Sequence, residues 1–539
     1  MANGADCGAW VYPITLYFWT ATNGVKLGGD PFVLIYDQPS IAHLQIGKMY
    51  IRHVTVENVK SFKGEHKFPL GPGVNYFVGD NNSGKSTVLE ALLFAFQGPS
   101  QTKWTPETFY CRNGSGRTRV QVDIAGGVED LVKKDKFSVL KDFVFNVDGE
   151  KVLRLERSSE QRKVTQGKKT KDVDVRAVCF WHPERKQFEN VTGIDAKVKA
   201  IFDFEEVWAD AHPSDHIDFA NNKTLGRLLH ASFERFVQTD LWTNLTEAHQ
   251  RAFGPDETGS FTAETMRLAG ALKGIIDEQY GEASYRFDFD LPDANVFMKQ
   301  GILQVDDGAG ETPIGGKGTG MQRAVALGLI QLYARSSALE ESQDTTPLLL
   351  MLDEPETWLH PNAQLRLGDA LNKIGDKDQV FIVTHSPYLI RKFKADKHLL
   401  TVLTGKGENR CVDSSTEFGL FGEGEPTWGE INYRAFGVYS VEFHNELFGW
   451  VQRHLEAQKD NGKPASNREI DEFLKQENVP VNKVWIATPS LKQFETTLPM
   501  FVRNSIHHPE NRENDPVSDE ELRDSIEHLV RIVKLINAR

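Results

Sequence analysis

The stretch Gly79–Ser86, which reads GDNNSGKS, decides the fold class of this chain. It matches the phosphate-binding loop GxxxxGK[ST]. The apolar segment Asn75–Val78 precedes it with a strand pattern, and Thr87–Phe96 follows it with a helix pattern. Glycines in such a loop let backbone N–H groups surround a phosphate at a helix N-terminus, where the peptide dipoles favour an anion. The sequence therefore predicts an α/β fold with a P-loop.

A second stretch, Leu348–Pro355, complements the loop. An apolar run that ends in two carboxylates predicts a buried parallel strand with charge at its carboxyl end. Asp353 is expected to hold Mg²⁺, and Glu354 is expected to polarise the attacking water as general base. Lys85 would reach the β- and γ-phosphates, and the Ser86 hydroxyl would ligate Mg²⁺. ATP and Mg²⁺ are thus the expected ligands.

These motifs resemble those of the ABC-type ATPases, the class that contains the SMC proteins and the OLD (overcoming lysogenisation defect) ATPases. The resemblance extends to DEPETWLHP at Asp353–Pro361 and to VTHSP at Val383–Pro387, which is similar to the histidine switch of that family, with His385 as its histidine. Gly318–Arg323 is similar to the family's signature loop, with Thr319 in place of the usual serine. In that family the signature loop of one subunit completes the ATP site of another, so the resemblance implies a homodimer or a higher even oligomer.

The resemblance also implies a set of site residues. The nucleotide-binding residues come from the two loops: Gly79, Asn81, Asn82, Ser83, Gly84, Lys85, Ser86, Thr87, Thr319, Gly320 and Gln322. The implied catalytic residues are Glu354 and His385, and the implied metal ligands are Ser86 and Asp353. The glutamine of the family's Q-loop could be Gln97, Gln101 or Gln121.

The chain divides into an ABC-type P-loop ATPase head with a helical insertion and a C-terminal all-α domain. The expected segments are an N-terminal extension at 1–48, an ATPase lobe at 49–184, the insertion at 185–300, a second ATPase lobe at 301–405, a linker at 406–429 and the helical domain at 430–539. Strand-like alternation begins at Met49, so the first segment is either an upstream extension that is not native or a real N-terminal hairpin. The polar stretch Arg162–Lys171 is either a solvated hairpin tip or a loop that faces nucleic acid.

Two features depart from the relatives of this class. The gap between Lys85 and Thr319 is 319 − 85 = 234 residues, too short for the long coiled-coil arms of SMC proteins. OLD nucleases carry a Toprim domain with a D-x-D pair after the histidine switch, and no D-x-D pair follows His385. That nuclease is therefore expected to be missing, and another module is expected in its place.

The C-terminal segment Leu498–Pro509 resembles the R-x4-6-H motif of HEPN ribonuclease domains, through Arg503 and His508. His507 competes with His508 for the histidine role. In that family the chemistry needs no metal: the histidine aids attack by a ribose 2′-OH and the arginine stabilises charge on the phosphate. The resemblance implies an RNA substrate, with tRNA as the leading candidate. The alternatives are a HEPN fold used only for binding or oligomerisation, and an unrelated helical cap.

Composition limits the class of protein further. The chain has 62 Lys+Arg and 76 Asp+Glu, a formal net charge of −14, so contact with nucleic acid requires a local basic patch. Mean hydropathy is −0.42, no apolar run reaches about 18 residues, and the N-terminus lacks the basic start of a signal peptide. Four scattered cysteines exclude a disulfide framework and a zinc cluster. A cytoplasmic protein without membrane contact is expected.

Three hypotheses on function follow. The first is an ATPase that senses a trigger and gates a HEPN-type RNA endonuclease in phage defence by abortive infection. The second is a Septu-like ATPase that works with a separately encoded partner nuclease, such as an HNH protein. The third is a DNA-repair ATPase of the SMC or RecF kind.

Overall fold

The computed structural model describes residues 48–98, 105–114, 116–160, 162–166, 169–173, 177–210, 212, 214–220, 223–254, 259–289, 294–308, 310–339, 346–405, 410–414, 418–422, 426–459 and 463–538. All of them lie within one compact unit, His43–Arg539. Residues 1–47 of the expected N-terminal extension lie outside the described residues. Among the described residues, none of the helices has the length and apolarity that a membrane span requires.

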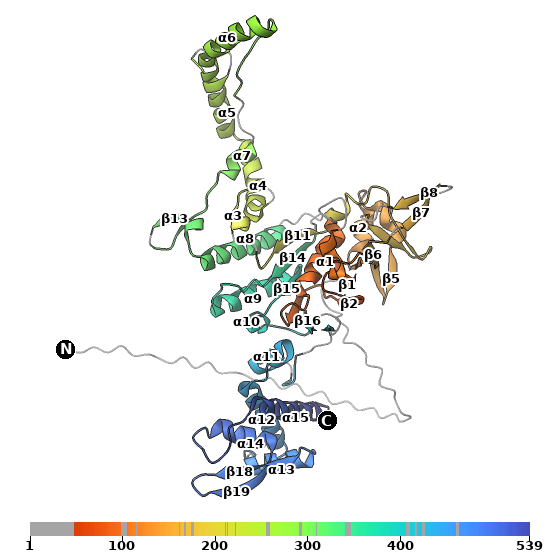
Figure 1. Ribbon diagram of the computed structural model, residues 1–539, viewed down its shortest axis with the longest axis vertical. Helices are drawn as coiled ribbons and strands as arrows, with labels where there is room; N and C mark the ends of the chain where they lie inside the picture. The colour runs from red at the N-terminus through yellow and green to blue at the C-terminus, as the bar shows by residue number, and fades with distance from the viewer. Residues whose placement is uncertain are drawn as a thin grey trace, which may run out of the picture. The chain divides into compact units, whose positions relative to one another are not determined.

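A six-stranded sheet with the order β11-β14-β15-β3-β16-β17 forms the centre of the head (Figure 1). Its strands are β3 (Val74–Gly79), β11 (Asp203–Val207), β14 (Leu348–Asp353), β15 (Gln379–Val383), β16 (His398–Thr404) and β17 (Cys411–Asp413). Every residue of β3, β14 and β15 is buried, as expected of parallel strands covered on both faces. The two predicted strands around the loop and the carboxylates are confirmed.

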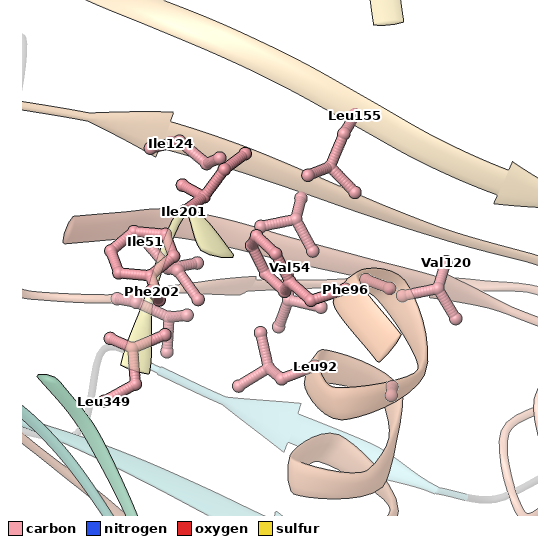
Figure 2. Packing of buried hydrophobic residues seen from close by; sticks show 14 of the residues in the cluster. Ile51, Val54, Leu92, Phe96, Val120, Ile124, Leu155, Ile201, Phe202 and Leu349 are labelled. Carbon is pink, nitrogen blue, oxygen red and sulfur yellow. The ribbon is translucent and has the colours of Figure 1, made fainter. Parts of the chain in front are cut away.

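The first face of this sheet packs on helix α1 (Lys85–Gln97) and on a second sheet of antiparallel strands. Figure 2 shows Leu92 and Phe96 of α1 among Val54, Val120 and other apolar side chains of this core. The second sheet comprises β1 (Tyr50–Glu57), β2 (Glu65–Pro69), β4 (Arg119–Ala125), β5 (Phe145–Val147), β6 (Glu150–Ser158), β9 (Cys179–His182) and β10 (Gln187–Glu189). The predicted helix at 87–96 is confirmed, with ends close to those expected.

Helices cover the other face of the central sheet. They are α8 (Thr319–Leu339), α9 (Pro361–Gly375), α10 (Pro387–Ile390) and α11 (Trp428–Phe436). Their apolar residues, among them Leu327, Leu371 and Ile431, form a second core with β14 and β15. The strand ends that carry the motifs are therefore fixed from both sides.

The helical insertion begins later than the sequence indicated. Strands β10 and β11 fall within 185–300, and β11 pairs in parallel with β14, so this part of the segment belongs to the head. The insertion's helices are α3 (Ser214–Ile217), α4 (Thr224–Val237), α5 (Asp240–Phe253), α6 (Phe261–Tyr280) and α7 (Ala294–Lys299). A hairpin, β12 (Gln304–Asp306) with β13 (Glu311–Pro313), leads to α8.

Two smaller elements complete the head. Helix α2 spans Val128–Lys133. The polar stretch forms a hairpin of β7 (Arg162–Gln166) with β8 (Lys169–Val173), so the hairpin part of that prediction is confirmed.

The C-terminal segment is not all-α, and in this respect the prediction is wrong. It contains α12 (Val441–Ala457), α13 (Asn467–Gln476), a hairpin of β18 (Val481–Ala487) with β19 (Lys492–Thr497), α14 (Leu498–His507) and α15 (Asp519–Asn537). The sequence VNKVWIA of β18 is rich in β-branched and aromatic residues, which favour strands. In the expected linker 406–429, β17 pairs with β16 and α11 starts at Trp428.

Candidate nucleotide site

The P-loop joins β3 to α1 and has a backbone that glycine must supply. Gly79 has φ 120°, and a Cβ there would lie 1.9 Å from the carbonyl oxygen of Leu403. Gly84 has φ 99°, and a Cβ there would lie 2.7 Å from the hydroxyl of Ser61. Asn82 takes the left-handed conformation with φ 62°. The loop is therefore a tight cradle in which backbone amides are available to an anion.

Lys85 lies inside this cradle. Its side chain is buried, and Nζ donates to the carbonyls of Gly79 at 3.2 Å and Asp80 at 2.7 Å. Burial lowers the pKa of Lys85, while the carboxylates of Glu354 and Asp353 oppose this shift. The cation is thus poised at the carboxyl edge of β3.

Asp353 ends β14 next to the start of α1. The Ser86 hydroxyl donates to its Oδ1 at 3.0 Å, and the Asp353 side chain is buried. Burial raises the pKa of Asp353 to about 6, and Glu354 adds to the shift, while the Ser86 hydrogen bond and Lys85 oppose it. The two predicted metal ligands are therefore adjacent.

Glu354 and His385 follow β14 and β15, two neighbouring strands. The distance between Glu354 Oε1 and His385 Nε2 is 3.9 Å, and both side chains are partly exposed. Burial, followed by the charge of Lys85, lowers the pKa of His385, so the imidazole is neutral near pH 7. The structure brings together the predicted base, histidine, lysine and metal ligands at one sheet edge.

Glu356 belongs to this site and was missed by the sequence analysis, although it lies within DEPETWLHP. Its Oε1 accepts hydrogen bonds from Thr384 Oγ1 at 2.8 Å and from the His385 amide at 2.7 Å. Its Oε2 is buried and has no partner in the structure. Glu356 therefore fixes the loop that carries His385.

The remaining predicted P-loop residues differ in exposure. Asn81 and Asn82 are exposed, whereas Ser83 and Thr87 are buried. The Ser83 hydroxyl has no hydrogen-bond partner in the structure. Arg410, which precedes β17 and was not predicted, donates to the Asn82 carbonyl at 3.1 Å. The segment expected to be a linker thus contacts the P-loop.

The signature loop lies at the N-terminus of α8. Thr319 is exposed, and Gly320 lies against Trp358, because a Cβ on Gly320 would be 3.2 Å from the Trp358 carbonyl oxygen. Gln322 is buried and donates to the carbonyls of Gly315 at 3.2 Å and Lys317 at 2.7 Å. Within one chain, the hydrogen bonds of Gln322 hold the signature loop in place, and Thr319 is exposed to solvent.

The Q-loop candidates remain undecided. Gln97 ends α1, and Gln121 lies in β4, where its side chain accepts a hydrogen bond from Arg119. Gln101 lies outside the described residues.

The residues present fit ATP and Mg²⁺. A hydroxyl and a carboxylate, Ser86 and Asp353, are hard oxygen ligands of the kind that Mg²⁺ prefers. The glycine cradle, the buried Lys85 and the unpartnered Ser83 hydroxyl together suit phosphate oxygens.

The predicted C-terminal pair contacts two different elements. The Arg503 guanidinium lies 6.0 Å from the ring centroid of Phe448 in α12. His508 follows the last residue of α14 and has φ −127° and ψ 59°, so it lies outside the regular helix that carries Arg503. The His508 ring lies 6.2 Å from the ring of Trp485 in β18.

His507 is electrostatically close to Arg503. Burial lowers the pKa of His507, and the charges of Arg503 and His508 add to the shift. Beneath them, His444 of α12 is fully buried, and its Nε2 lies 2.9 Å from Ser525 Oγ. Its Nδ1 has no partner in the structure. Burial lowers the pKa of His444 to about 3, so Arg503 and His507 lie close to a neutral, buried imidazole.

Two family comparisons match the head. Residues 53–209 match the AAA domain, and residues 213–390 match the AAA ATPase domain. Both parts of the head are thus similar to AAA ATPase domains. These matches include the P-loop, Glu354 and His385, which the geometry places together.

The head is also similar to proteins named OLD nucleases. The Old nuclease of Escherichia phage P2 is 24% identical over 358 residues, which cover 62% of this chain and 56% of that protein. The OLD nuclease of Thermus scotoductus is 23% identical over 232 residues, or 40% of this chain and 42% of that protein. The chain spans about half the length of the curated relatives it matches. A solved SMC head bound to the C-winged helix domain of ScpA is 15% identical, with a TM-score of 0.40 and coverage of 68% of this chain and 97% of that one.

Proposed function

We propose that the chain is an ATP-hydrolysing gate of a phage-defence system, in which two heads enclose ATP and the C-terminal segment acts on nucleic acid. The observation that carries the ATPase half is the convergence of Lys85, Ser86, Asp353, Glu354 and His385 at one edge of the central sheet. The similarity to OLD nucleases supports a nuclease-related role.

The mechanism follows from these side chains. Lys85 and the loop amides bind the phosphates, and Ser86 with Asp353 would hold Mg²⁺, which supplies charge neutralisation on the phosphate oxygens. Glu354, a partly exposed carboxylate, takes the proton of the attacking water at its side-chain oxygen. Neutral His385 orients the water or the γ-phosphate as a hydrogen-bond donor or acceptor.

The accessible signature loop supports the proposed dimerisation. Each chain has one P-loop and one exposed Thr319 at the N-terminus of a long helix. The helix N-terminus offers N–H groups to the γ-phosphate of a second chain.

The test is phosphate release by the purified chain, with light scattering in the presence and absence of ATP. The expected results are Mg²⁺-dependent hydrolysis and an ATP-dependent increase to a dimer or a higher even oligomer. Lys85→Ala should bind no ATP and should show neither effect. If the purified chain hydrolyses ATP while it remains strictly monomeric, the proposed dimer is wrong.

We propose as the second part of this function that the C-terminal segment is a HEPN-type, metal-independent RNA endonuclease. The observation that favours it is the cluster of Arg503, a cation, with the neutral imidazoles of His507 and His444. Burial lowers the pKa of all three groups, and the causes of these shifts include no carboxylate. Such a cluster in a chain with net charge −14 suits a phosphate group.

His508 opens onto a neighbouring cleft with a volume of about 520 Å³. It is lined by Trp485, Ser505, Ile506, His508, Pro509, Asn511, Arg512, Asn514, Asp515, Pro516 and Val517. An indole, an imidazole and a guanidinium around one cleft suit an unstacked RNA base next to a phosphate.

The test is incubation of the ATP-loaded chain with total tRNA in the presence of EDTA added after ATP loading. The expected result is cleavage that leaves a 2′,3′-cyclic phosphate, because neither Arg503 nor His508 requires a metal. Intact RNA, together with cleavage only after a separately encoded HNH protein is added, would instead support the Septu-like alternative. Binding of DNA without cleavage of either nucleic acid would support the SMC- or RecF-like alternative.

A further inference from the structure

The first turn of α8 holds both ends of the loop that carries the proposed base. Gly320 lies against the carbonyl of Trp358, at one end of that loop. Arg323, three residues further along, donates from NH2 to the carbonyl of Glu354 at 3.2 Å, at the other end. Arg323 is 4% exposed, and its Nε is buried without a partner. The signature helix is therefore in direct contact with the backbone of Glu354.

The backbone of this loop is strained at the same two positions. Glu354 has φ 47° and Trp358 has φ 68°, in the left-handed region that side chains disfavour. Such a conformation persists only where surrounding contacts hold it. The Glu354 carbonyl accepts hydrogen bonds from Arg323, from the Thr357 amide at 3.1 Å and from the Thr357 hydroxyl at 2.9 Å.

Of these donors, Arg323 is the one from outside the loop. The Glu354 amide itself donates to Val383 in β15 at 2.9 Å, so the amide side is fixed to the sheet. A shift of α8 would therefore change the contact at the carbonyl and leave the amide in place. That difference is what can rotate the Glu354 side chain between a productive and an unproductive direction.

Arg323 is also a buried cation among carboxylates. Burial lowers its pKa, and the charges of Glu356, Glu354 and Asp353 oppose that shift. A guanidinium presents several N–H donors in a planar fork, and a lysine ammonium cannot reproduce that geometry. Arg323 can thus exchange one acceptor for another as α8 moves.

The other end of this helical turn faces outward. Thr319 is exposed and Met321 is 42% exposed, whereas Gln322 and Arg323 are buried. The turn thus has an outer side, available to a second chain, and an inner side in contact with this chain's own site. A ligand that contacts Thr319 would therefore affect Glu354 through Arg323, which lies four positions further along the same helix.

We propose that Arg323 is a positioning residue that couples the two ATP sites of the dimer: contact of the signature loop with the partner's nucleotide sets, through Arg323, the conformation of Glu354 in the chain's own site. The proposal rests on the proposed ATPase dimer. Its consequence is that hydrolysis in one site requires nucleotide in the other.

The test uses mixed dimers made by co-expression of two differently tagged chains. One chain is the parent, and the other carries Lys85→Ala, so only one site of the dimer holds ATP. Without coupling, the mixed dimer hydrolyses ATP at the parent rate per filled site. With coupling, the rate per filled site should fall by about 5- to 150-fold, the usual range of coupling between sites.

The role of Arg323 is then isolated in the same assay. Arg323→Met and Arg323→Lys should each bind ATP with the parent affinity but hydrolyse slowly in the symmetric dimer. Emptying the second site should then cause no further loss of rate, because the coupling is already absent. Arg323→Lys keeps the buried charge and serves if the Met variant does not fold.

Arg227→Met is the matched control. Arg227 contacts α8 away from its first turn, where the guanidinium lies 4.3 Å from the Tyr333 ring centroid, and its NH1 donates to Glu205 of β11 at 2.8 Å. Its loss should lower the melting temperature but leave the dependence of one site on the other intact. A purely structural role of Arg323 would give the same result as Arg227→Met.

Two results would overturn the proposal. One is a mixed dimer that hydrolyses ATP at the full rate per filled site. The other is an Arg323 variant that still slows further when the second site is emptied. A parent protein that hydrolyses no ATP at all would instead refute the proposed function, so the two failures are distinguishable.

Discussion

Replacement of Glu354 by glutamine tests the central chemical assignment. The amide has the shape of the carboxylate but cannot accept a proton from water. The hydrogen bonds that hold this residue involve its backbone, so they survive the change. The contact between Glu354 Oε1 and the neutral His385 imidazole, at Nε2, is 3.9 Å long and partly exposed, so its loss should cost below about 1 kcal/mol of folding free energy.

The expected kinetic effect is much larger. General-base catalysis contributes about 10²–10⁴-fold, which is about 3–5 kcal/mol of activation free energy at about 1.36 kcal/mol per tenfold. Glu354→Gln should therefore lower kcat by that factor while ATP affinity stays at the parent value. Because ATP is bound but not consumed, the dimer should accumulate.

Phosphate release, equilibrium binding of ATP and light scattering measure these three quantities on one protein sample. Glu129→Gln, on the exposed face of α2, is the matched control and should behave as the parent does. If Glu354→Gln hydrolyses ATP within about tenfold of the parent, general-base catalysis by this residue is too small to matter and the assignment is wrong.

Three further outcomes are expected. The pKa of Asp353 is raised to about 6 in the folded chain, so the protonated form contributes stability at low pH that is lost as the pH rises through about 6. Because Mg²⁺ binds the deprotonated carboxylate, the thermal shift caused by Mg²⁺ with an ATP analogue should grow over the same pH range. Gly79→Ala places a Cβ 1.9 Å from the Leu403 carbonyl oxygen, so it should remove ATP binding and cost at least about 1–3 kcal/mol in denaturant unfolding. Arg503→Ala and His508→Ala should each remove toxicity to a bacterial host while ATP hydrolysis continues.

Each of these outcomes has a matched control and a contradicting result. Asp353→Asn should abolish the pH dependence of the Mg²⁺ shift, and a shift that is equal at pH 5 and pH 8 in the parent would contradict the role of Asp353. A Cβ at Gly449, in α12, meets nothing within 4 Å, so Gly449→Ala should retain ATP binding. Arg468→Ala, on the exposed side of α13, should remain toxic. A toxic variant that lacks both Arg503 and His508 would reduce the C-terminal segment to a docking domain.

The sequence predicted which strand ends lie together because the signals for them are local. The loop, the apolar run before Asp353 and the segment at His385 each lie on one strand end, and parallel strands bring their carboxyl ends to one edge. What the sequence could not predict are contacts between distant segments. Arg323 carries no local sign of its bond to Glu354, and the approach of Arg410 to Asn82 depends on β17 pairing at the sheet edge.

The errors in the domain boundaries have the same origin. Strand β11 reads as part of a polar segment before the helices, and only its pairing with β14 assigns it to the head. In the C-terminal segment the hairpin β18–β19 lies between helices with clear apolar periodicity, and short strands of this kind carry a weak pattern. His508 falls outside α14 because that helix ends one residue earlier.

The link between the two halves of the proposed function is α11. Ile431 of this helix belongs to the core of the head, while Tyr433 packs on the core of the C-terminal segment. The buried carboxylate of Glu430 accepts hydrogen bonds from the amides of Gly419 at 2.8 Å and Leu420 at 2.9 Å. A helix packed into both cores transmits displacement as a rigid element, whereas a flexible linker would absorb it. If nucleotide closure of the heads regulates the C-terminal segment, α11 is therefore an element that can transmit the change.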